Sequence, residues 1–314
     1  MSVRVHGFGA PPRVEDIPDP TCPPGHTSVQ IAAATVGHID RSIWSGSFLR
    51  HPPLPYTPGV EASGVVVESA RFAPGERVWV RGGGLGTACD GTWAERAVAP
   101  DEVIGALPDG VDFGTGSGFF SPCTSAWIAL HSIGQVSAGQ TELVTGATGA
   151  GGSIAVQLAA EAGACVVGSV SHPDRLGDLP DGVEGIVTAP DIRDVCPPVD
   201  LVIDTVGGAV RNPWCQLSRR VARSSSLVTP PARRVTLDLP MLIQHDVSLR
   251  PPNVIHREPE GRAVAAEVLA RLAEGRLTLD ATRFGFQQAG EALDWVASSG
   301  HRGRAVLVPD GAPR

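Results

Sequence analysis

Lysine is absent from this sequence, because all 25 basic residues of the 314-residue chain are arginine. Without lysine, no Schiff base can form with a carbonyl substrate or with pyridoxal phosphate. A phosphate-binding loop of the G-x-x-x-x-G-K-[ST] type is excluded for the same reason, as is a Tyr-x-x-x-Lys pair that relays a proton. Tyrosine occurs only once, as Tyr56, so tyrosine chemistry has one possible position.

Long apolar runs and paired cysteines are missing as well. No hydrophobic stretch approaches the ~20 residues of a membrane span, and the first residues lack the apolar segment of a signal peptide. The six cysteines include no C-x-x-C pair, which excludes a zinc ribbon and a dithiol redox motif. The net charge of −8 argues against nucleic acid as the main partner, because phosphate binding needs a basic face. We therefore expect a cytoplasmic protein with reduced thiols, no membrane contact and no nucleic-acid partner.

The residues that are present indicate two domains. A chain of 314 residues exceeds one typical hydrophobic core, and its 42% hydrophobic and 18% charged residues are typical of a globular protein. The first ~120 residues are rich in glycine and proline and predict a β-rich domain with one short helix at 38–44. The strands predicted in this part are 29–33, 62–67, 77–80 and 92–98.

Strands alternate with helices from about residue 121 onward. The predicted strands are 141–145, 164–170, 185–188, 199–204, 225–228 and 246–249, and the predicted helices are 124–131 and 152–162. This alternation indicates βαβ units, a doubly wound parallel sheet and therefore an α/β fold. The remaining chain predicts helices at 258–274 and 289–298 and a final strand at 305–308.

The strongest motif is the glycine-rich turn between the predicted strand 141–145 and the helix that follows it. Gly146 permits a tight turn, Gly149 lets the backbone approach a pyrophosphate, and Gly152 allows the helix to lie close to the strand. The N–H groups at the start of the helix then face the phosphates. We therefore expect a dinucleotide here rather than a purely structural turn. Its predicted contacts in this turn are Gly146, Thr148, Gly149, Ala150, Gly151 and Gly152.

The end of the second predicted strand indicates which dinucleotide binds. An NAD site usually places an acidic residue there, which binds both ribose hydroxyls. This chain has Val170 and Ser171 at that place, so no carboxylate repels a 2′-phosphate. Ser171 can donate a hydrogen bond, and Arg175 can supply positive charge, although a solvated arginine is the alternative. We expect NADPH rather than NADH.

The order of these features resembles the medium-chain dehydrogenase/reductase superfamily, and within it the zinc-free branch of quinone oxidoreductases and enoyl reductases. Short-chain dehydrogenases have a similar turn, but they place it at the N-terminus and need the Tyr-x-x-x-Lys pair that this chain lacks. The stretches that carry the resemblance are LPYTPGVEASG at 54–64, APGERV at 73–78, GTWAE at 91–95, the turn and helix at 146–158, VDLVIDTVGG at 199–208, and GRAVL at 303–307.

This resemblance implies a domain division and further contacts. Residues 1–122 and 254–314 would form a GroES-like catalytic domain, and 123–253 a Rossmann domain that binds NADPH. The cofactor would lie in the cleft between them. Thr124, Thr205, Val206 and Asn253 would add cofactor contacts. The resemblance also implies a homodimer, in which the segment 246–253 is an edge strand that continues the sheet into a second copy.

The resemblance also indicates that no metal is bound. Zinc-dependent members of the superfamily hold their catalytic metal with residues that correspond to Gly37, Val60 and Ser121. A catalytic zinc needs about three protein ligands, and all three of the usual ligand residues are replaced here. His38 alone does not make a metal site, and a structural histidine is its simpler interpretation.

Three further departures affect the expected pocket. Relatives often have asparagine at the position of Gly37, and tyrosine at the positions of Phe48 and Ala189. The remaining candidates for catalysis are His38, Asp40 and Tyr56; their structural alternatives are a satisfied histidine, a carboxylate that holds its own backbone, and an aromatic packing residue. Water can supply the proton, so a side-chain acid is helpful rather than obligatory.

These observations together predict an NADPH-dependent, zinc-free enzyme. It would transfer a hydride to an activated alkene, in an α,β-unsaturated ketone or a quinone. One alternative is a specialised biosynthetic enzyme that uses the same scaffold for a single intermediate. The other is a redox-silent protein that binds NADPH without turning it over.

Overall fold

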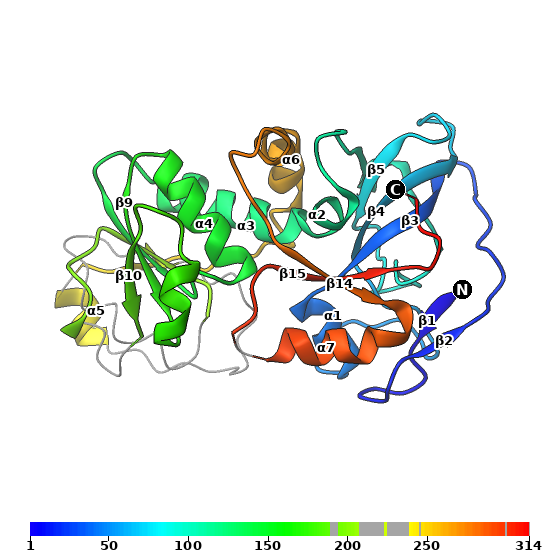
Figure 1. Cartoon of the computed structure of the whole chain (residues 1–314), viewed down its shortest axis with the longest axis horizontal. Coiled ribbons are helices and arrows are strands. Elements are labelled where there is room, and N and C mark those ends of the chain that lie inside the picture. Colours follow the sequence, from blue (N-terminus) through cyan, green and yellow to red (C-terminus); the bar gives the residue numbers. More distant parts are fainter. Residues whose placement is uncertain (189–193, 207–222, 225–238, 245, 299, 314) are drawn as a thin grey trace. The chain divides into compact units, whose positions relative to one another are not determined.

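The computed structural model describes residues 1–188, 194–206, 223–224, 239–244, 246–298 and 300–313. The chain forms two compact units (Figure 1). The first contains residues 1–120 and 269–314, and the second contains residues 121–268. The predicted strand at 225–228 and the residue Ala189 lie outside the described part of the chain. No helix within that part is long and apolar enough to cross a membrane.

The first unit is built on a mostly antiparallel sheet of seven strands in the order β14-β15-β3-β4-β5-β7, with β6 also paired to β3. These strands are β3 (His26–Val36), β4 (Glu61–Glu68), β5 (Arg77–Arg81), β6 (Arg96–Pro100), β7 (Ile104–Ala106), β14 (Ala281–Gly285) and β15 (Arg304–Val308). A separate ribbon pairs β1 (Ser2–Arg4) with β2 (Arg13–Glu15). The C-terminal strand β15 lies antiparallel to β3, so residues more than 260 positions apart become neighbours in this sheet.

Short helices complete the first unit. Helix α1 (His38–Trp44) follows β3 directly, and its bounds are the predicted ones. The Asp40 carboxylate accepts a hydrogen bond of 2.8 Å from the N–H group of Gly37, which holds the first turn of this helix. Helix α7 (Ala289–Ala297) covers the sheet and buries Leu293 and Val296 in its core. The strand predicted at 92–98 begins later, as β6, because the chain before it forms backbone hydrogen bonds with residues 57–59 instead of with the sheet.

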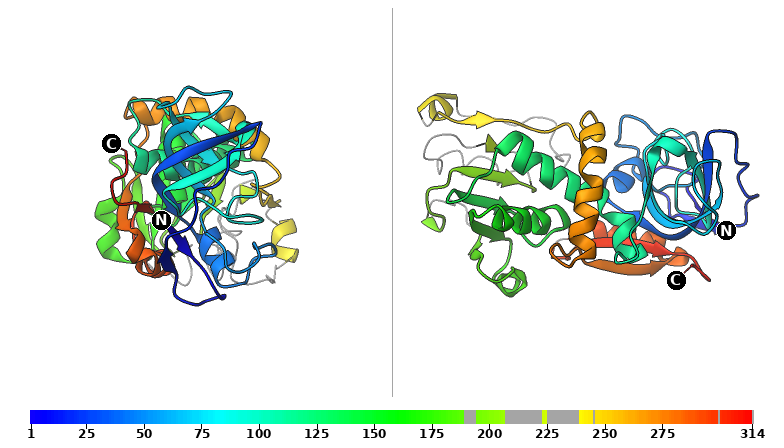
Figure 2. Two further views of the ribbon diagram at one scale, coloured as in Figure 1. Left: turned by 90° about the vertical axis from the view of Figure 1, so that its right-hand side faces the viewer. Right: turned by 90° about the horizontal axis from the view of Figure 1, so that it is seen from above.

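The second unit contains a six-stranded parallel sheet in the order β10-β9-β8-β11-β12-β13. Its strands are β8 (Thr141–Thr145), β9 (Cys165–Val170), β10 (Glu184–Val187), β11 (Leu201–Asp204), β12 (Arg223–Ser224) and β13 (Ser248–Leu249). The chain starts in the middle of the sheet at β8, moves outward to β10, and returns to add β11 on the other side. This is the strand order of a doubly wound Rossmann sheet, and the predicted fold class is confirmed. Strand β13 lies at one edge (Figure 2).

The helices of this unit connect and flank its strands. They are α3 (Ser125–Trp127), α4 (Ala150–Glu161) and α5 (Leu239–Gln244), with a short 3-10 turn η4 (Pro173–Asp178). Helix α6 (Glu258–Ala273) begins in this unit, and its last residues belong to the first unit. The helix predicted at 124–131 is part of a longer helical stretch, because π-helical turns at Phe120–Thr124 and Ile128–Gly134 flank α3. This stretch begins as α2 (Phe113–Gly118) in the first unit, which the sequence pattern did not predict because three of its six residues are glycine.

One strand of the second unit carries a buried acid. Glu142 on β8 is 0% exposed, and neither of its carboxyl oxygens has a hydrogen-bond partner among the described residues. Its neighbours in the sheet are Val166 and Leu201, which are apolar. Burial raises the pKa of this carboxyl well above its ordinary value of 4.5. The folded chain therefore keeps a proton that the unfolded chain releases above about that pH.

We expect Glu142→Leu to stabilise the protein and to remove a pH dependence. The raised pKa means that folding takes up a proton, so the stability of the native protein falls as the pH rises from ~4.5 toward the folded-state pKa. The leucine variant removes this loss and the unsatisfied carboxyl, which is worth ~1–3 kcal/mol. Urea unfolding between pH 5 and pH 8 measures both effects.

Glu142→Gln is the matched control for this measurement. It cannot titrate, so its stability should lose the part of the pH slope that Glu142 causes and keep the part that the raised pKa of Asp40 causes, but its amide remains buried without partners and the gain in stability should be smaller. A leucine variant that keeps the wild-type slope would show that the slope comes from another group.

Candidate functional site

The glycine-rich turn after β8 is built by a close approach of backbone to backbone. A Cβ atom on Gly152 would lie 2.1 Å from the carbonyl oxygen of Gly146, a distance that no side chain can accept. Gly146 has a φ of +62°, and a Cβ atom there would lie 2.7 Å from the side chain of Val206. Both positions therefore require glycine, one for space and the other for space and backbone conformation.

The start of α4 lies open beside this turn. Gly149 is the N-cap residue of the 12-residue helix, and no side chain caps the helix start. The N–H groups of the first helical turn and the positive end of the helix dipole therefore remain available to an anion. A pyrophosphate fits this arrangement, because the glycines remove the side chains that would keep it at a distance.

The carboxyl ends of β8 and β11 are tied together next to the turn. Thr145 donates a hydrogen bond of 2.7 Å from its hydroxyl to the buried carboxylate of Asp204. The hydroxyl of Thr205 donates to the backbone carbonyl of Thr145 at 2.6 Å, and the N–H group of Val206 donates to Asp204 at 3.1 Å. These bonds place two predicted cofactor contacts, Thr205 and Val206, against Gly146, which is a third. Asp204, which holds them, was not predicted as a site residue.

The end of β9 holds the two residues predicted to select NADPH. Val170 is buried, and Ser171 follows it as an exposed residue. The Nε of Arg175 donates to the Asp178 carboxylate at 2.5 Å, and the arginine side chain is only 13% exposed. The guanidinium is therefore held within its own turn by a carboxylate, rather than extended into solvent.

The other two predicted cofactor contacts have different environments. Thr124 is 4% exposed and lies in the helical stretch before α3. Asn253 is exposed, and its side chain accepts a hydrogen bond of 3.0 Å from the N–H group of His256. The structure thus brings together the glycine turn, Thr205 and Val206, whereas Asn253 caps a turn of its own segment.

In the first unit, Asp40 and Tyr56 are buried side chains, each 1% exposed. Burial raises the pKa of Asp40 to about 7, and it does so against the opposing effects of the Gly37 amide and the Arg304 guanidinium. The Tyr56 ring lies in an apolar cluster with Ile43 and Val60, and its hydroxyl has no hydrogen-bond partner among the described residues. Burial and the nearby Asp40 raise the pKa of the tyrosine, so its hydroxyl stays protonated.

His38 differs from these two residues because it retains contact with solvent. The pKa of His38 is lowered to about 4. Burial of the ring by surrounding protein atoms is the largest cause, and the positive charges of Arg304 and His301 add to it. The imidazole is therefore neutral at pH 7. It can accept or donate a hydrogen bond there, but it does not carry an acidic proton.

A group of buried charges that was not predicted lies beside these residues. The Nε of Arg81 donates to the Glu61 carboxylate at 2.9 Å, and Arg304 forms an ion pair with the same carboxylate at 3.6 Å. Glu61 is only 2% exposed. The available signal was a charged residue at the first or last position of an otherwise mostly apolar strand, and the register of β4 against β5 pairs Glu61 with Arg81.

The positions expected to lack zinc ligands are also described in this unit. A Cβ atom on Gly37 would lie 3.2 Å from a terminal nitrogen of Arg304. Val60 is 5% exposed in the apolar cluster around Tyr56, and Phe48 is a partly buried member of the same cluster. The described residues contain no group of three or more histidine, cysteine, aspartate or glutamate side chains that could hold a metal ion.

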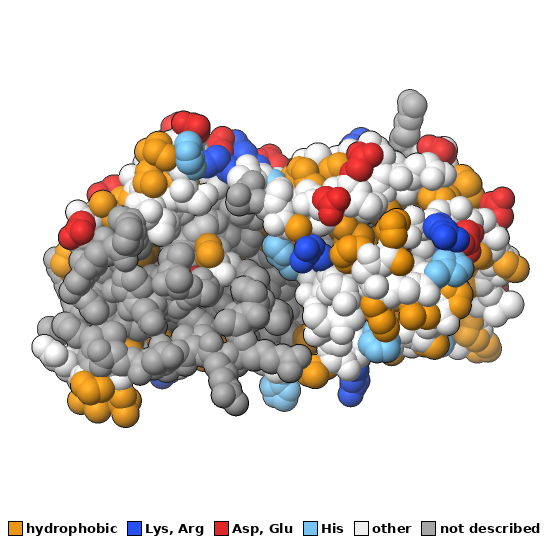
Figure 3. Space-filling view, turned by 90° about the horizontal axis from the view of Figure 1, so that it is seen from below, with side chains coloured by type: hydrophobic (Ala, Val, Ile, Leu, Met, Phe, Trp, Pro, Cys, Tyr) orange, Lys and Arg blue, Asp and Glu red, His pale blue; other side chains and the backbone are white. Residues whose placement is uncertain are grey.

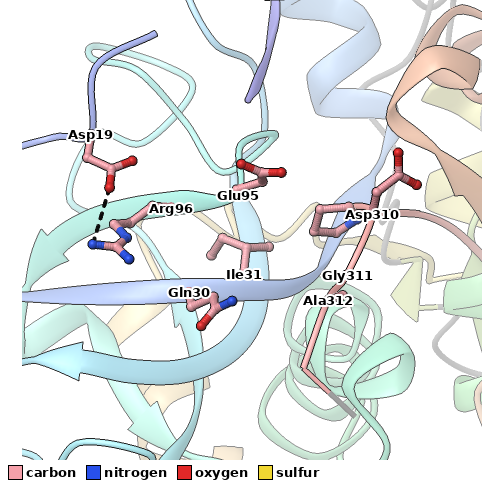
Figure 4. Close-up of a pocket in the computed structure, with 9 residues that line it drawn as sticks. Asp19, Gln30, Ile31, Glu95, Arg96, Asp310, Gly311 and Ala312 are labelled. Atoms are coloured by element: carbon pink, nitrogen blue, oxygen red, sulfur yellow. Dashed lines mark ion pairs between the residues drawn. The ribbon is translucent and has the colours of Figure 1, made fainter. Parts of the chain in front are cut away.

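A pocket of about 250 Å³ also opens in the first unit, at a distance along the sheet from these residues (Figure 4). Asp19 and Arg96 line one side of it and form an ion pair of 3.3 Å. Glu95, another lining residue, accepts a hydrogen bond of 2.6 Å from the N-terminal amine. None of the predicted site residues lines this pocket, and its main charged groups are already paired with the protein, so it is not the candidate site.

Comparisons with known proteins agree with this organisation. Residues 23–109 match the alcohol dehydrogenase GroES-like domain, and residues 186–307 match the zinc-binding dehydrogenase family. The quinone oxidoreductases of Pongo abelii and Homo sapiens are each 33% identical over 175 residues, which covers 54% of this chain and 52% of theirs. The chain thus spans about half the length of the curated relatives it matches.

Solved structures share the whole fold. An alcohol dehydrogenase superfamily protein from Novosphingobium aromaticivorans superposes with a TM-score of 0.84 at 24% identity, over 98% of both chains. A quinone oxidoreductase from Pseudomonas syringae gives a TM-score of 0.84 at 23% identity, over 98% of this chain and 99% of that one. At these identities, the similarity establishes the fold alone.

We expect Gly152→Ala to damage both the fold and dinucleotide binding. The added Cβ atom meets the Gly146 carbonyl, so α4 must move away from the turn, at a cost of ~1–3 kcal/mol in the free energy of unfolding. Thermal melting and a fluorescence titration with NADPH measure the two effects, and the affinity should fall at least about tenfold.

Gly149→Ala separates these two effects. Its backbone conformation is ordinary and its Cβ atom would lie 3.3 Å from the nearest atom, so the melting temperature should change little while NADPH affinity falls. Gly290→Ala on α7 is the matched control, because a Cβ atom there meets nothing within 4 Å. Undiminished NADPH binding in both turn variants would show that the dinucleotide does not use this turn.

Proposed function

The chain belongs to the medium-chain dehydrogenase/reductase superfamily, and on that basis we propose that it is a cytoplasmic, NADPH-dependent, zinc-free reductase of α,β-unsaturated ketones or quinones. The observation that carries this proposal is the glycine turn. It leaves the start of α4 uncapped and requires glycine at positions 146 and 152. When bound there, the nicotinamide cofactor supplies the hydride for the reduction.

NADPH is favoured over NADH by the charges at the end of β9. The first residue after the buried end of the strand is Ser171, so no carboxylate occupies the place where NAD sites bind the ribose hydroxyls. Arg175 lies in the following turn with its guanidinium held by Asp178. A 2′-phosphate would carry more charge than the Asp178 carboxylate and would compete for the same guanidinium.

The absence of zinc is favoured by the side chains at the positions of the usual ligands. Gly37 has no side chain, and the Val60 side chain is buried among apolar neighbours. Zinc requires nitrogen, sulfur or oxygen ligands, and neither residue supplies one. The GroES-like unit would therefore position a substrate without a metal.

The predicted catalytic residues take different roles in this proposal. His38 retains contact with solvent and is neutral at pH 7, so it would orient a substrate by a hydrogen bond. Asp40 and Tyr56 are buried, so they would support the pocket rather than touch a substrate, with Asp40 fixing the start of α1. The proton that completes the reduction would then come from water.

Apolar side chains near this region favour a substrate with apolar parts. The exposed fraction is 98% for Leu49, 39% for Leu54 and 40% for Phe8. The Phe8 ring lies 4.5 Å from the ring of His51, so these segments are neighbours. Orange apolar and pale-blue histidine side chains lie together on the first unit in Figure 3.

A specialised enzyme on the same scaffold is the second candidate. Gly37 and Phe48 replace the polar residues that relatives often have, which favours one particular substrate over a general range of quinones. This candidate predicts weak turnover of simple quinones but efficient conversion of one intermediate. A redox-silent protein would bind NADPH and convert neither.

The proposal includes a homodimer formed through the edge of the Rossmann sheet. Strand β13 has a neighbour on one side only within the described sheet. Helix α5 next to it buries Leu242 against the core but leaves Leu239 62% exposed and Ile243 72% exposed. An edge strand beside exposed apolar side chains is suited to pairing with a second copy.

We expect the purified protein to oxidise NADPH in the presence of an enone or a quinone, with no added metal and no loss of rate after treatment with a chelator. The specificity constant kcat/KM should be higher with NADPH than with NADH. Arg175→Ala should raise the KM for NADPH by about tenfold, with little effect on NADH, because one charge-assisted contact to the 2′-phosphate is lost. Absorbance at the reduced nicotinamide band measures each rate.

Arg283→Ala serves as the matched control for this assay, since Arg283 pairs with Asp112 on the surface of the first unit. NADPH binding without any turnover across a panel of enones and quinones would contradict the proposed activity and favour the redox-silent alternative.

We expect the protein to elute as a dimer in size-exclusion chromatography with light scattering at micromolar concentration. The double substitution Leu239→Glu with Ile243→Glu should shift it toward monomer, because it places charge on the proposed interface. A wild-type protein that remains monomeric would rule out this interface.

A further inference from the structure

Arg304 is a largely buried cation whose side-chain donors are not used by the residues that the structure describes. Its side chain is 13% exposed, and it donates no hydrogen bond to any of the described residues. The Nε atom is fully buried without a partner. Glu61 forms an ion pair with the guanidinium, but the nearest carboxylate oxygen lies 3.6 Å from a terminal nitrogen, too far for a hydrogen bond, and the Asp40 carboxyl lies close by, beside Gly37.

This arrangement has a cost at Nε, which is the donor atom of this side chain that is fully buried without a partner among the described residues. A guanidinium has five N–H donors in a planar fork, and unsatisfied buried donors carry a large desolvation penalty. Glu61 does not satisfy them, because its nearer oxygen lies 3.6 Å away, while its other oxygen accepts a hydrogen bond from Arg81 at 2.9 Å. Two arginines therefore share one carboxylate, and their combined charge exceeds that of Glu61.

The guanidinium lies against the backbone of Gly37, which has no side chain in the space that the guanidinium occupies. A Cβ atom on Gly37 would lie 3.2 Å and 3.3 Å from its two terminal nitrogens. Gly37 has a φ of −123°, which any residue can adopt, so the space and not the backbone explains the glycine. The guanidinium also lies near the solvent-accessible His38, whose pKa its charge lowers.

We propose that the Arg304 guanidinium binds the carbonyl oxygen of the substrate and stabilises the enolate that forms from it. This inference rests on the proposed function, and it adds a catalytic residue to that function. It also explains how a pocket without zinc, and without a polar side chain at position 37, can polarise a carbonyl group.

In the proposed reduction, negative charge develops on this one carbonyl oxygen. Hydride adds to the β-carbon of the enone, the electron pair of the C=C bond shifts toward the carbonyl, and the oxygen becomes the negative end of an enolate. The Arg304 charge stabilises that oxygen, and one proton from water then adds to the α-carbon. The products are the saturated ketone and the oxidised cofactor.

The test compares Arg304→Met with Arg302→Met. Arg302 is a neighbouring arginine whose side chain is 51% exposed and pairs with Asp280 at 3.0 Å. We expect Arg304→Met to lower kcat/KM for an enone by about 100- to 1,000-fold, as for other oxyanion donors, with an unchanged Kd for NADPH. Arg304→Lys, which keeps the charge but not the planar fork, should recover part of the loss.

Gly37→Ala provides a variant in which the arginine remains. Its Cβ atom crowds the guanidinium, so kcat should fall although the charge and the ion pair with Glu61 are retained. Circular dichroism and thermal melting identify any variant that fails to fold, and Gly37→Ala keeps the proposal testable if Arg304→Met is one of these.

A binding measurement separates this inference from the proposed function. Benzoate, a planar carboxylate, serves as a probe of the oxygen site in the full-length chain with NADP⁺, and ligand-observed NMR measures its Kd. We expect Arg304→Met, but not Arg302→Met, to weaken benzoate binding by about tenfold.

The possible results distinguish the two proposals. A wild-type protein that reduces no acceptor would contradict the proposed function, while the benzoate comparison still decides whether Arg304 binds an oxygen ligand. Equal kcat/KM and equal benzoate affinity in the two methionine variants would overturn the role of Arg304. A rise in the Kd for NADPH that matches the loss of kcat/KM would also overturn it, because the guanidinium would then hold the cofactor.

Discussion

The close approach of α4 to the turn after β8 is the constraint on which the Rossmann unit depends. The helix passes so near the Gly146 carbonyl that a single methyl group on residue 152 would overlap it. This contact sets where the helix begins, and therefore where its first N–H groups point. It also brings the ends of β8 and β11 together, where the hydrogen bonds of Thr145 and Asp204 hold the segment that follows β11. A binding surface for an anion results from packing geometry, with no charged side chain in the turn.

The GroES-like unit is constrained differently, because it holds charged side chains where little water reaches them. Glu61, Arg81 and Arg304 lie on strands whose other residues are mostly apolar. Their charges balance only in part, and the burial of Asp40 raises its pKa to about 7, which reduces the negative charge of the group further. The balance leaves a net positive environment near His38 and Gly37. An electron-rich oxygen is the ligand that such an environment favours.

Much of the fold could be predicted from residue patterns, because local rules act strongly in this chain. The bounds of α1 and β8 agree with the prediction, since a capping residue and a run of β-branched residues act within a few positions. Strand β6 and the helix α2 deviate because long-range contacts decide them. The chain before β6 bonds to residues 57–59, and α2 forms in a glycine-rich segment that local propensity disfavours. The predicted glycines of the site are adjacent in sequence, so their geometry could be anticipated as well.

The amino-acid sequence by itself determined the class of fold, the glycine-rich turn between β8 and α4, and the chemistries that a chain without lysine cannot perform. These properties depend on residue type and on spacing over short distances. Only the tertiary structure decided which charged groups meet. It paired Arg175 with Asp178, buried Asp40 and Tyr56, and placed the Arg304 guanidinium over Gly37, about 270 residues earlier in the chain. The register of β15 against β3 produces that last contact, and a sheet register between distant strands is a property of the folded core rather than of any local pattern.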